Sequence, residues 1–382
     1  MGMVIDFQHT EINCCESRMD ILVVHPSLND RGGSEKVLLS IIESVKEKGH
    51  NVTLGTFEKT DWQKAKEFFG EVWKPDAELI HPRMFGTSAY GELLNFHLLL
   101  AKVPKKFKKV VIISTTSPWF YCPDAEKAIV YFNCSPVKYG CGFKRAYLIP
   151  YNFIQRQLIK KAKNKFFLAN SIFSSRAIKS VYGLQPEVVY PPVNLKAFKP
   201  SSQKENIIVS VGRYNPSKKF ETLILAFSKV DRGRCLIIGS MRDRVSLVYF
   251  KKLERLISDL KLRNRVNLIV NCSSDILQRI LARAKIYVHC STYEYFGISI
   301  VEAMACGCVP IVYRNGGPYI DIISYNKYGF SFEKVDELAN KINLILDENE
   351  TFKRFSKKAI ERSKVFSEDA FKCKLVEIVE SW

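Results

Sequence analysis

S-T-Y-E-Y-F-G-I-S-I-V-E-A-M-A-C-G-C-V-P-I-V, residues 291–312, is the stretch that decides the fold. It follows an apolar segment, Ile286–Cys290, that predicts a buried strand, and its end overlaps a second predicted strand, Val309–Tyr313. Between the two strands, a polar loop leads into a helix that we expect to begin near Ser299 and to stop at Gly307. Strands alternating with helices in this way are typical of a parallel sheet with helices on both faces.

Two carboxylates, Glu294 and Glu302, lie on either side of the predicted helix start. Backbone N–H groups at a helix N-terminus have no intrahelical partner and therefore favour an anion. A carboxylate can accept hydrogen bonds from two hydroxyls at once. These features together suit a ligand with many hydroxyls and a phosphate between them, which describes a nucleotide sugar. The simplest alternative is a chance spacing in which Glu302 only favours the helix dipole.

The same segment resembles the signature of the family 4 (group 1) retaining glycosyltransferases, which have the GT-B fold. The resemblance rests on Glu294 and Glu302 with Phe296-Gly297 between them, then Ala303-Met304-Ala305 and Gly307. It implies an α/β protein with two Rossmann-like doubly wound parallel-sheet domains facing a cleft. It also implies a catalytic role for Glu294 and donor binding by Phe296, Gly297, Ile298 and Glu302.

A basic loop, Gly212-Arg213-Tyr214-Asn215-Pro216-Ser217-Lys218, follows the predicted strand Ile207–Val211. A nucleotide sugar leaves as a diphosphate, so the developing charge needs fixed cations; Arg offers a planar fork and Lys a point charge. Surface loops are commonly basic, but family members carry Gly-Arg and, further on, Lys-Gly here. The resemblance therefore implies catalytic roles for Arg213 and Lys218 and a place for Gly212 beside the donor, although Lys219 stands where the family usually has Gly.

In the first half, Gly32-Gly33 separates a predicted strand, Ile21–His25, from a helix that we expect to start at Ser34 as N-cap and to run to Glu47. A double Gly is otherwise only a tight turn. Because the resemblance extends through Gly-Gly-Ser-Glu at 32–35, we expect Gly32 and Gly33 to let the backbone approach the donor across the cleft.

The chain departs from the family pattern at Asn133. Many family members have a His after the corresponding strand, here Ile129–Phe132, that points at the transferred sugar. Asn can hydrogen-bond a sugar hydroxyl but cannot donate a proton. We expect Asn133 to occupy this catalytic position, and the departure puts donor identity or rate in doubt more than the reaction class.

Strand and helix patterns repeat in both halves of the 382-residue chain, with a polar linker at residues 199–204. We expect an N-terminal, acceptor-side Rossmann-like domain over residues 19–198 and a nucleotide-sugar-binding Rossmann-like domain over 205–366. The resemblance implies that the last helix, 367–382, crosses back to the first domain. Residues before Met19 show no periodic pattern, and we expect them to be dispensable.

Formal net charge is +19, and it is concentrated between Lys127 and Pro186, where there is no Asp or Glu. Residues 144–165 predict a basic helix within this stretch. Interleaved basic and aromatic residues suit an anionic membrane, a lipid phosphate or nucleic acid. A solvated helix face is the plain alternative, but such faces normally mix signs. We expect an anionic membrane surface and no nucleic acid.

Localisation and cofactors are constrained by what the sequence lacks. No apolar run reaches the ~18 residues of a transmembrane helix, and the first residues lack a signal-peptide pattern. The 11 cysteines are odd in number and fall mostly in apolar runs, as expected of reduced core residues. We expect a cytoplasmic, peripherally membrane-associated protein. Because there is no Asp-X-Asp motif, neither a metal nor another cofactor is implied.

The segments Gly32–Val37 and Tyr190–Val193 look most like the mannosyltransferases of lipid-linked oligosaccharide assembly. The resemblance therefore implies transfer of a hexose, of mannose or glucose type, from a nucleoside-diphosphate sugar to a lipid-linked or glycan acceptor. One alternative is the same enzyme with a soluble or polymeric acceptor. Another is a non-catalytic protein of this fold that binds a nucleotide sugar or nucleic acid, which Asn133 favours and the other site residues oppose.

Overall fold

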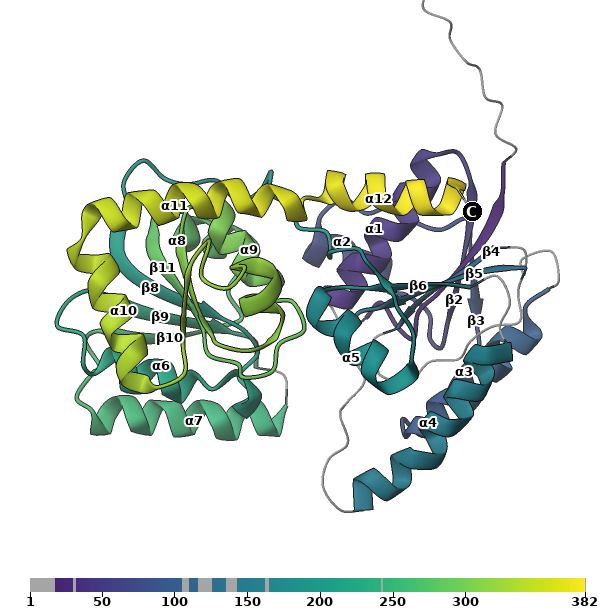
Figure 1. The fold of residues 1–382 in the computed structure, drawn as a ribbon, viewed down its shortest axis with the longest axis horizontal. Helices are drawn as coiled ribbons and strands as arrows, with labels where there is room; N and C mark the ends of the chain where they lie inside the picture. The colour runs from purple at the N-terminus through teal and green to yellow at the C-terminus, as the bar shows by residue number, and fades with distance from the viewer. Residues whose placement is uncertain are drawn as a thin grey trace, which may run out of the picture.

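The computed structural model describes residues 18–29, 32–104, 110–115, 126–134, 143–161, 165–241 and 243–381. Two parallel sheets stand side by side, with helices above and below each sheet in the view of Figure 1. The predicted α/β fold with two Rossmann-like domains is thereby confirmed. Residues 1–17 of the leader lie outside the described residues, as do residues 135–142 and 162–164 of the stretch without Asp or Glu.

The N-terminal domain is built on a seven-stranded sheet of order β3-β2-β1-β4-β5-β6-β7. Its strands are β1 (Asp20–Val24), β2 (Asn51–Thr56), β3 (Ala77–Ile80), β4 (Val110–Thr115), β5 (Lys127–Phe132), β6 (Lys165–Ala169) and β7 (Glu187–Val188). Its helices are α1 (Gly33–Glu47), α2 (Trp62–Phe69), α3 (Ala89–Lys102), α4 (Phe143–Lys161) and α5 (Ile172–Tyr182).

The C-terminal domain repeats the pattern on a six-stranded sheet of order β10-β9-β8-β11-β12-β13. Its strands are β8 (Glu205–Val211), β9 (Arg234–Gly239), β10 (Val266–Val270), β11 (Ala284–His289), β12 (Val309–Tyr313) and β13 (Phe330–Phe332). Its longer helices are α6 (Phe220–Phe227), α7 (Arg244–Asp259), α8 (Ser274–Arg283), α9 (Ile298–Ala305), α10 (Val335–Asp347) and α11 (Asn349–Ser363). Short helical turns are η2 (Pro216–Lys218), η3 (Pro318–Ile322) and η4 (Lys364–Phe366).

Central strands of both sheets are short apolar runs, because parallel strands covered by helices on both faces must be apolar on both sides. Residues Ile21 to Val24 of β1 are all 0% exposed. In both sheets the strand order reverses next to the first strand, between β1 and β4 and between β8 and β11. Ligands of such sheets bind outside the carboxyl ends of the strands at this switch point. We therefore expect the ligand to bind at the loops after β1, β8 and β11.

The chain crosses between the domains twice, and the two crossings pair with each other. Val193, on the way out, forms an isolated parallel bridge with Ser367, on the way back. The final helix α12 (Glu368–Ser381) then lies along α1 (Figure 1). Its apolar side chains Phe371, Leu375 and Ile378 belong to the core cluster of the N-terminal domain. The last helix is therefore part of the first domain's core.

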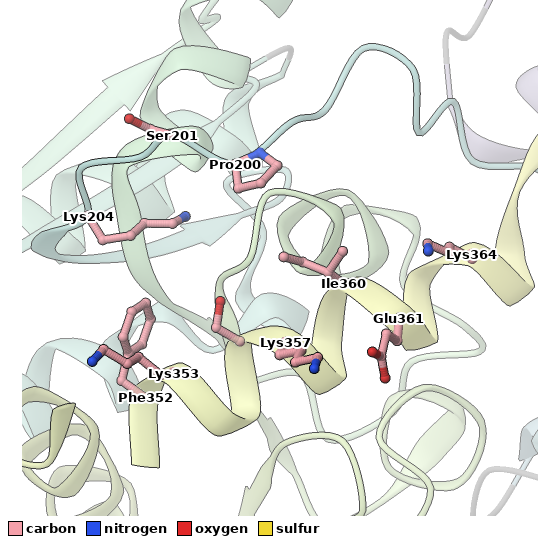
Figure 2. A pocket seen from close by; sticks show the side chains of 10 residues that line it. Pro200, Ser201, Lys204, Phe352, Lys353, Lys357, Ile360, Glu361 and Lys364 are labelled. Atoms are coloured by element: carbon pink, nitrogen blue, oxygen red, sulfur yellow. The ribbon is translucent and has the colours of Figure 1, made fainter. Parts of the chain in front are cut away.

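The polar linker before β8 is anchored by Lys204. Its ammonium donates hydrogen bonds to the main-chain carbonyls of Ala284 at 2.9 Å and Cys306 at 2.5 Å. Lys204 borders a hollow of about 420 Å³ that the linker forms with α11 (Figure 2). Because the ammonium already bonds two carbonyls, this lysine fixes the linker to the C-terminal sheet.

One predicted helix boundary is wrong. Helix α1 starts at Gly33 with Gly32 as its N-cap, whereas Ser34 lies inside the first turn. The reason is Glu35, whose carboxylate accepts the Gly32 N–H at 2.7 Å and the Ser34 hydroxyl at 2.8 Å. A carboxylate three residues after the cap satisfies an orphan N–H there, so the helix does not need the Ser34 hydroxyl as its cap.

None of the helices that the structure describes is long and apolar enough to span a membrane. Helix α4 confirms the expected helix in the acid-free stretch, although it ends at Lys161. Of its basic residues, Arg156 is exposed and donates to the main-chain carbonyl of Val181 at 2.9 Å. The side chains of Lys144, Lys160 and Lys161 are not among those that the structure describes.

Candidate active site

A cleft of about 1240 Å³ lies between the two domains. All the predicted site residues line it: Gly32, Gly33, Asn133, Gly212, Arg213, Lys218, Glu294, Phe296, Gly297, Ile298 and Glu302. The N-terminal domain contributes the start of α1 and the loop after β5. The C-terminal domain contributes the loops after β8 and β11 and the start of α9. Residues separated by more than half of the chain are thus brought to one cleft.

The centre of the C-terminal wall is an ion pair between Lys218 and Glu294. The ammonium nitrogen lies 2.5 Å from Oε2 of the carboxylate. His289 at the end of β11 brings its Nε2 to 3.2 Å from the same oxygen. This nitrogen makes no well-aligned hydrogen bond within the described part of the chain. One carboxylate oxygen therefore receives a cation from the loop after β8 and an imidazole from β11.

Electrostatics keep Glu294 ionised. Burial by itself raises the pKa of this carboxyl, but Lys218 and His289 outweigh burial and hold the pKa well below its usual range. Burial also lowers the pKa of His289, and the neighbouring Lys218 charge adds to the effect, while Glu294 offsets part of it. The imidazole is thus neutral and the carboxylate charged at neutral pH. Glu294 can accept hydrogen bonds and cannot donate a proton.

The start of α9 depends on Gly297, whose φ of +104° lies in the left-handed region that favours glycine. Gly297, Ile298 and Ser299 at the start of this helix line the cleft. Across the cleft, Gly33 begins α1, and a Cβ added there would lie 3.0 Å from Cδ1 of Ile298. The absence of a side chain at Gly33 allows the two domains to approach at this point. Two helix N-termini therefore border the same space, which is favourable for an anion.

Glu302 lies in the second turn of α9 and lines the same cleft. Burial raises the pKa of its carboxyl, and the charge of Lys36, which lies on α1 in the other domain, opposes this rise. Lys36 also forms a 3.9 Å ion pair with Glu368 of α12. Glu302 is thus influenced by a cation from the opposite wall.

The side chains of Arg213 and Phe296 differ in exposure. Arg213 is exposed in the loop after β8. The Phe296 side chain is only 3% exposed and packs against Tyr190 and Phe366, with ring centroids 5.8 and 5.3 Å away. The Phe296 ring packs against residues of the two segments in which the chain crosses between the domains. Only the backbone of Phe296 can therefore face a donor.

Asn133 follows β5 on the N-terminal wall. Its amide Nδ2 donates to Oγ of Ser114 at 2.8 Å. Its main-chain carbonyl accepts a 2.6 Å hydrogen bond from Nδ2 of Asn170, which follows β6. Neighbouring strand ends thus fix the position of Asn133.

The sequence reasoning missed His289, Lys36 and Asp321. No role was predicted for His289, yet it ends the strand that leads to Glu294. Asp321 is 1% exposed and accepts hydrogen bonds from the N-terminus of α5 in the other domain. The signal for His289 was its place at a strand's carboxyl end. For Lys36 and Asp321 no sequence signal existed, because their partners lie far away in the chain.

Two Rossmann-like domains that face a cleft, with cations and carboxylates at the switch point of the second sheet, define a GT-B glycosyltransferase. The fold is that of solved structures of this class. Over 96% of this chain, it superimposes on 98% of a glycosyltransferase from Rickettsia africae with a TM-score of 0.75 and 20% identity. Over 95% of this chain, it superimposes on the whole of Anabaena HepE, solved in complex with UDP, with a TM-score of 0.76 and 19% identity.

Residues 194–362 match the family of glycosyl transferases group 1. The chain is a nucleotide-sugar-dependent glycosyltransferase, and the match to this group lies in its C-terminal domain. It is 26% identical to the GDP-Man:Man(3)GlcNAc(2)-PP-Dol alpha-1,2-mannosyltransferase of Dictyostelium discoideum, across 93% of this chain and 83% of that protein. Its identity to the protein of the same name from Mus musculus is 24%, across 91% of this chain and 84% of that protein.

Proposed function

We propose that this protein transfers mannose from GDP-mannose, with retention of the anomeric configuration, to a glycan carried on a lipid diphosphate. The relatives named above support both substrates, because the likeness covers nearly the whole chain and includes the acceptor-side domain. In the proposed step, the bond between the anomeric carbon and the diphosphate oxygen breaks. An acceptor hydroxyl oxygen bonds that carbon from the same face and gives its proton to the departing phosphate.

The observation that carries the proposal is the group Lys218, Glu294 and Arg213 at the carboxyl ends of β8 and β11. The two cations stabilise the negative charge that develops on the leaving diphosphate, together with the N–H groups of α9. The ionised Glu294 accepts hydrogen bonds from hydroxyls of the transferred sugar. Glu302 holds the ribose, and Asn133 faces the sugar from the N-terminal wall.

A thermal-shift screen of nucleotide sugars tests the donor. A ligand at ~100 times its dissociation constant stabilises the folded state by about 2.7 kcal/mol. We expect GDP-mannose and GDP to raise the melting temperature, and UDP-glucose to raise it less at the same concentration. Stabilisation by UDP-sugars alone would contradict the donor assignment. Stabilisation by no nucleotide sugar would contradict the proposal and favour the alternative that binds nucleic acid.

The acceptor assignment is supported by exposed apolar side chains on α4 and near α3, two helices of the N-terminal domain that lie side by side (Figure 1). Exposed fractions are 54% for Ile149 and 62% for Phe153 on α4, and 69% for Met84 in the loop before α3. Apolar side chains among basic residues favour insertion at an anionic membrane surface. We include peripheral binding to such a membrane, where a lipid-linked acceptor resides, in the proposed function.

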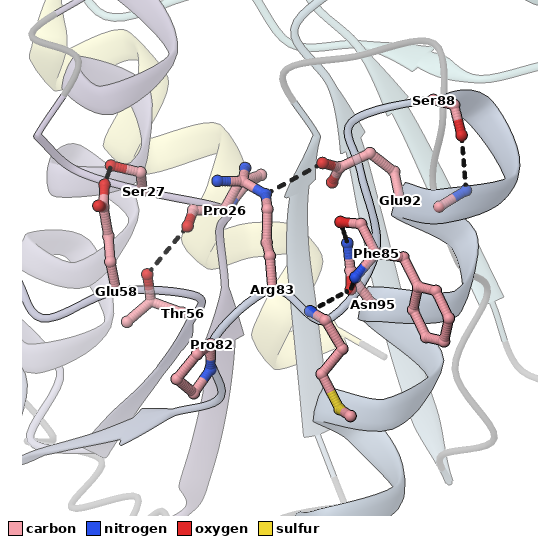
Figure 3. Close-up of polar contacts among 12 residues, drawn as sticks. Pro26, Ser27, Thr56, Glu58, Pro82, Arg83, Phe85, Ser88, Glu92 and Asn95 are labelled. Atoms are coloured by element: carbon pink, nitrogen blue, oxygen red, sulfur yellow. Dashed lines mark hydrogen bonds and ion pairs between the residues drawn. The ribbon is translucent and has the colours of Figure 1, made fainter.

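The loop that carries Met84 is held rigidly by polar contacts (Figure 3). The Asn95 side chain accepts the Met84 N–H at 3.0 Å and donates to the Phe85 carbonyl at 3.0 Å. Arg83 pairs with Glu92 at 3.1 Å. Because the backbone is fixed, the apolar tip stays exposed instead of folding back onto the domain.

A further inference from the structure

Asp321 fastens the two domains together. It lies in η3 of the C-terminal domain, and its two carboxylate oxygens accept main-chain N–H groups from the N-terminal domain. These bonds come from Ile172 at 2.7 Å and from Phe173 at 3.2 Å. Both donors belong to the first turn of α5, where N–H groups lack intrahelical partners and the helix dipole favours a negative charge. The contact is therefore a charge-assisted bond from one domain to the other.

The residues around Asp321 hold it in place from its own side of the interface. Arg362 donates hydrogen bonds to the main-chain carbonyls of Asp321 at 2.6 Å and Ile322 at 3.3 Å. The Tyr190 hydroxyl lies close to the Asp321 carboxyl and lowers its pKa. Tyr190 and the Arg362 guanidinium also pack against Phe366, where the chain crosses back. The backbone of Asp321 is thus held by Arg362, which itself packs against the interdomain crossing.

The same interface reaches the loop of Glu294 on both sides. On one side, Gly317, which directly precedes η3, donates its N–H to the Glu294 carbonyl at 2.9 Å. On the other side, the ring of Phe173 packs edge-on against Tyr293 with 5.3 Å between centroids. Phe173 is one of the two N–H donors to Asp321. A change in how α5 docks is therefore transmitted to the residues that flank Glu294.

We propose that Asp321 is a positioning residue that couples the docking of α5 to the placement of Glu294 for sugar transfer. The inference rests on the proposed role of Glu294. The nucleotide itself is held by Arg213, Lys218 and Glu302, none of which contacts Asp321. Loss of the coupling therefore lowers turnover while free nucleotide still binds, because misplacement by about 1 Å costs on the order of 10²-fold in rate.

The variant Asp321→Asn tests this, because it keeps the shape but replaces one acceptor oxygen by an NH₂ group that faces a backbone N–H. We expect kcat to fall roughly 10- to 100-fold, with KM for the donor and the Kd of GDP within about twofold of wild type. The matched control is Asp275→Asn, an exposed acid in the first turn of α8, which lies outside the interdomain contact and should leave kcat unchanged. Unchanged kcat in Asp321→Asn, or a large loss of GDP affinity, would overturn the proposal.

Hydrogen exchange supplies a readout that does not depend on the donor. In Asp321→Asn, amides at the start of α5 and those of residues 292–297 should lose protection together, while the β8 and β9 amides stay protected. Loss at α5 alone would show that docking is not coupled to the Glu294 loop and would overturn the inference. If wild type transfers no mannose, the proposed function fails, and this exchange pattern still decides the coupling.

Discussion

At the scale of single residues, the cleft combines fixed cations with an ionised carboxylate whose proton affinity is lowered by its neighbours. We expect Lys218→Ala and Arg213→Ala each to reduce transfer by roughly 10²–10³, as is typical when one group that stabilises developing charge is lost. Both side chains lie at the cleft surface and not in a core cluster, so the melting temperature should change little. Initial-rate measurements check this, and near-normal turnover in both variants would contradict the assignment.

Substitutions of Glu294 and Glu302 should affect different kinetic quantities, because Glu294 is placed at the transferred sugar and Glu302 at the ribose. Glu302→Ala should weaken GDP binding with a smaller effect on turnover. Glu294→Ala should lower turnover and leave GDP affinity largely intact. Calorimetric titration with GDP and single-turnover rates distinguish the two. Equal GDP affinity in Glu302→Ala and wild type would exclude the ribose contact.

The Asp321 carboxyl predicts a pH effect on stability. Burial raises its pKa to about 6, in spite of hydrogen bonds to Ile172 and Phe173 that lower it. The folded state therefore takes up this proton at a higher pH than the unfolded chain, so this group stabilises the fold at low pH and less so as pH rises through 6. Relative to Asp321→Asn, wild type should lose up to roughly 3 kcal/mol between pH 4 and pH 7. Urea unfolding of both proteins at the two pH values measures the difference, and parallel pH profiles would contradict the pKa.

At the scale of elements, the strands predicted before the site loops lie within two residues of β1, β5, β8, β11 and β12, because continuous apolar runs bounded by polar turns are strong signals. The sequence misplaced the start of α1, since a carboxylate at Glu35 replaced the expected hydroxyl cap. Sequence motifs predicted that Lys218 and Glu294 belong to one site. They did not reveal Asp321, because its partner N–H groups are 148 and 149 residues away in the chain. Contacts of that kind depend on how two finished domains dock, which no local pattern encodes.

Helix α4 carries a prediction about the membrane. Burial of one large apolar side chain is worth about 1.5–3 kcal/mol. Phe153→Ser or Ile149→Ser should therefore weaken binding to anionic vesicles roughly tenfold or more, with donor binding unchanged. The control is Ile276→Ser, at an exposed apolar position on α8 of the other domain. Sedimentation at low and high salt measures both contributions, because salt screens the basic residues only.

If vesicle binding is indifferent to Phe153 and Ile149 but falls steeply with salt, the basic residues alone are responsible. If the protein binds RNA or DNA with the same salt dependence and ignores vesicles, the membrane assignment is wrong. Indifference to both would make the acid-free stretch a solvated face.

At the scale of the whole molecule, the two domains do not fold from two separate stretches of chain. The N-terminal core includes α12, which the chain reaches only after the C-terminal domain is complete. Lys372 of α12 also pairs with Glu43 at 2.9 Å and Glu47 at 2.8 Å on α1. The last residues of the chain thus stabilise the first domain and fix the paired crossings beside the cleft.

Leu375 on α12 is 0% exposed. Its substitution should therefore destabilise the N-terminal domain, which is far away in the sequence. Leu375→Ala should lower the free energy of unfolding by ~2–5 kcal/mol, through lost burial and the cavity that remains. The matched control is Cys373→Ala, at an exposed position on the same helix. Hydrogen exchange should show the loss in α1 and β1, while GDP continues to protect the C-terminal sheet. Stability equal to wild type would mean that α12 does not belong to the core of the N-terminal domain in solution.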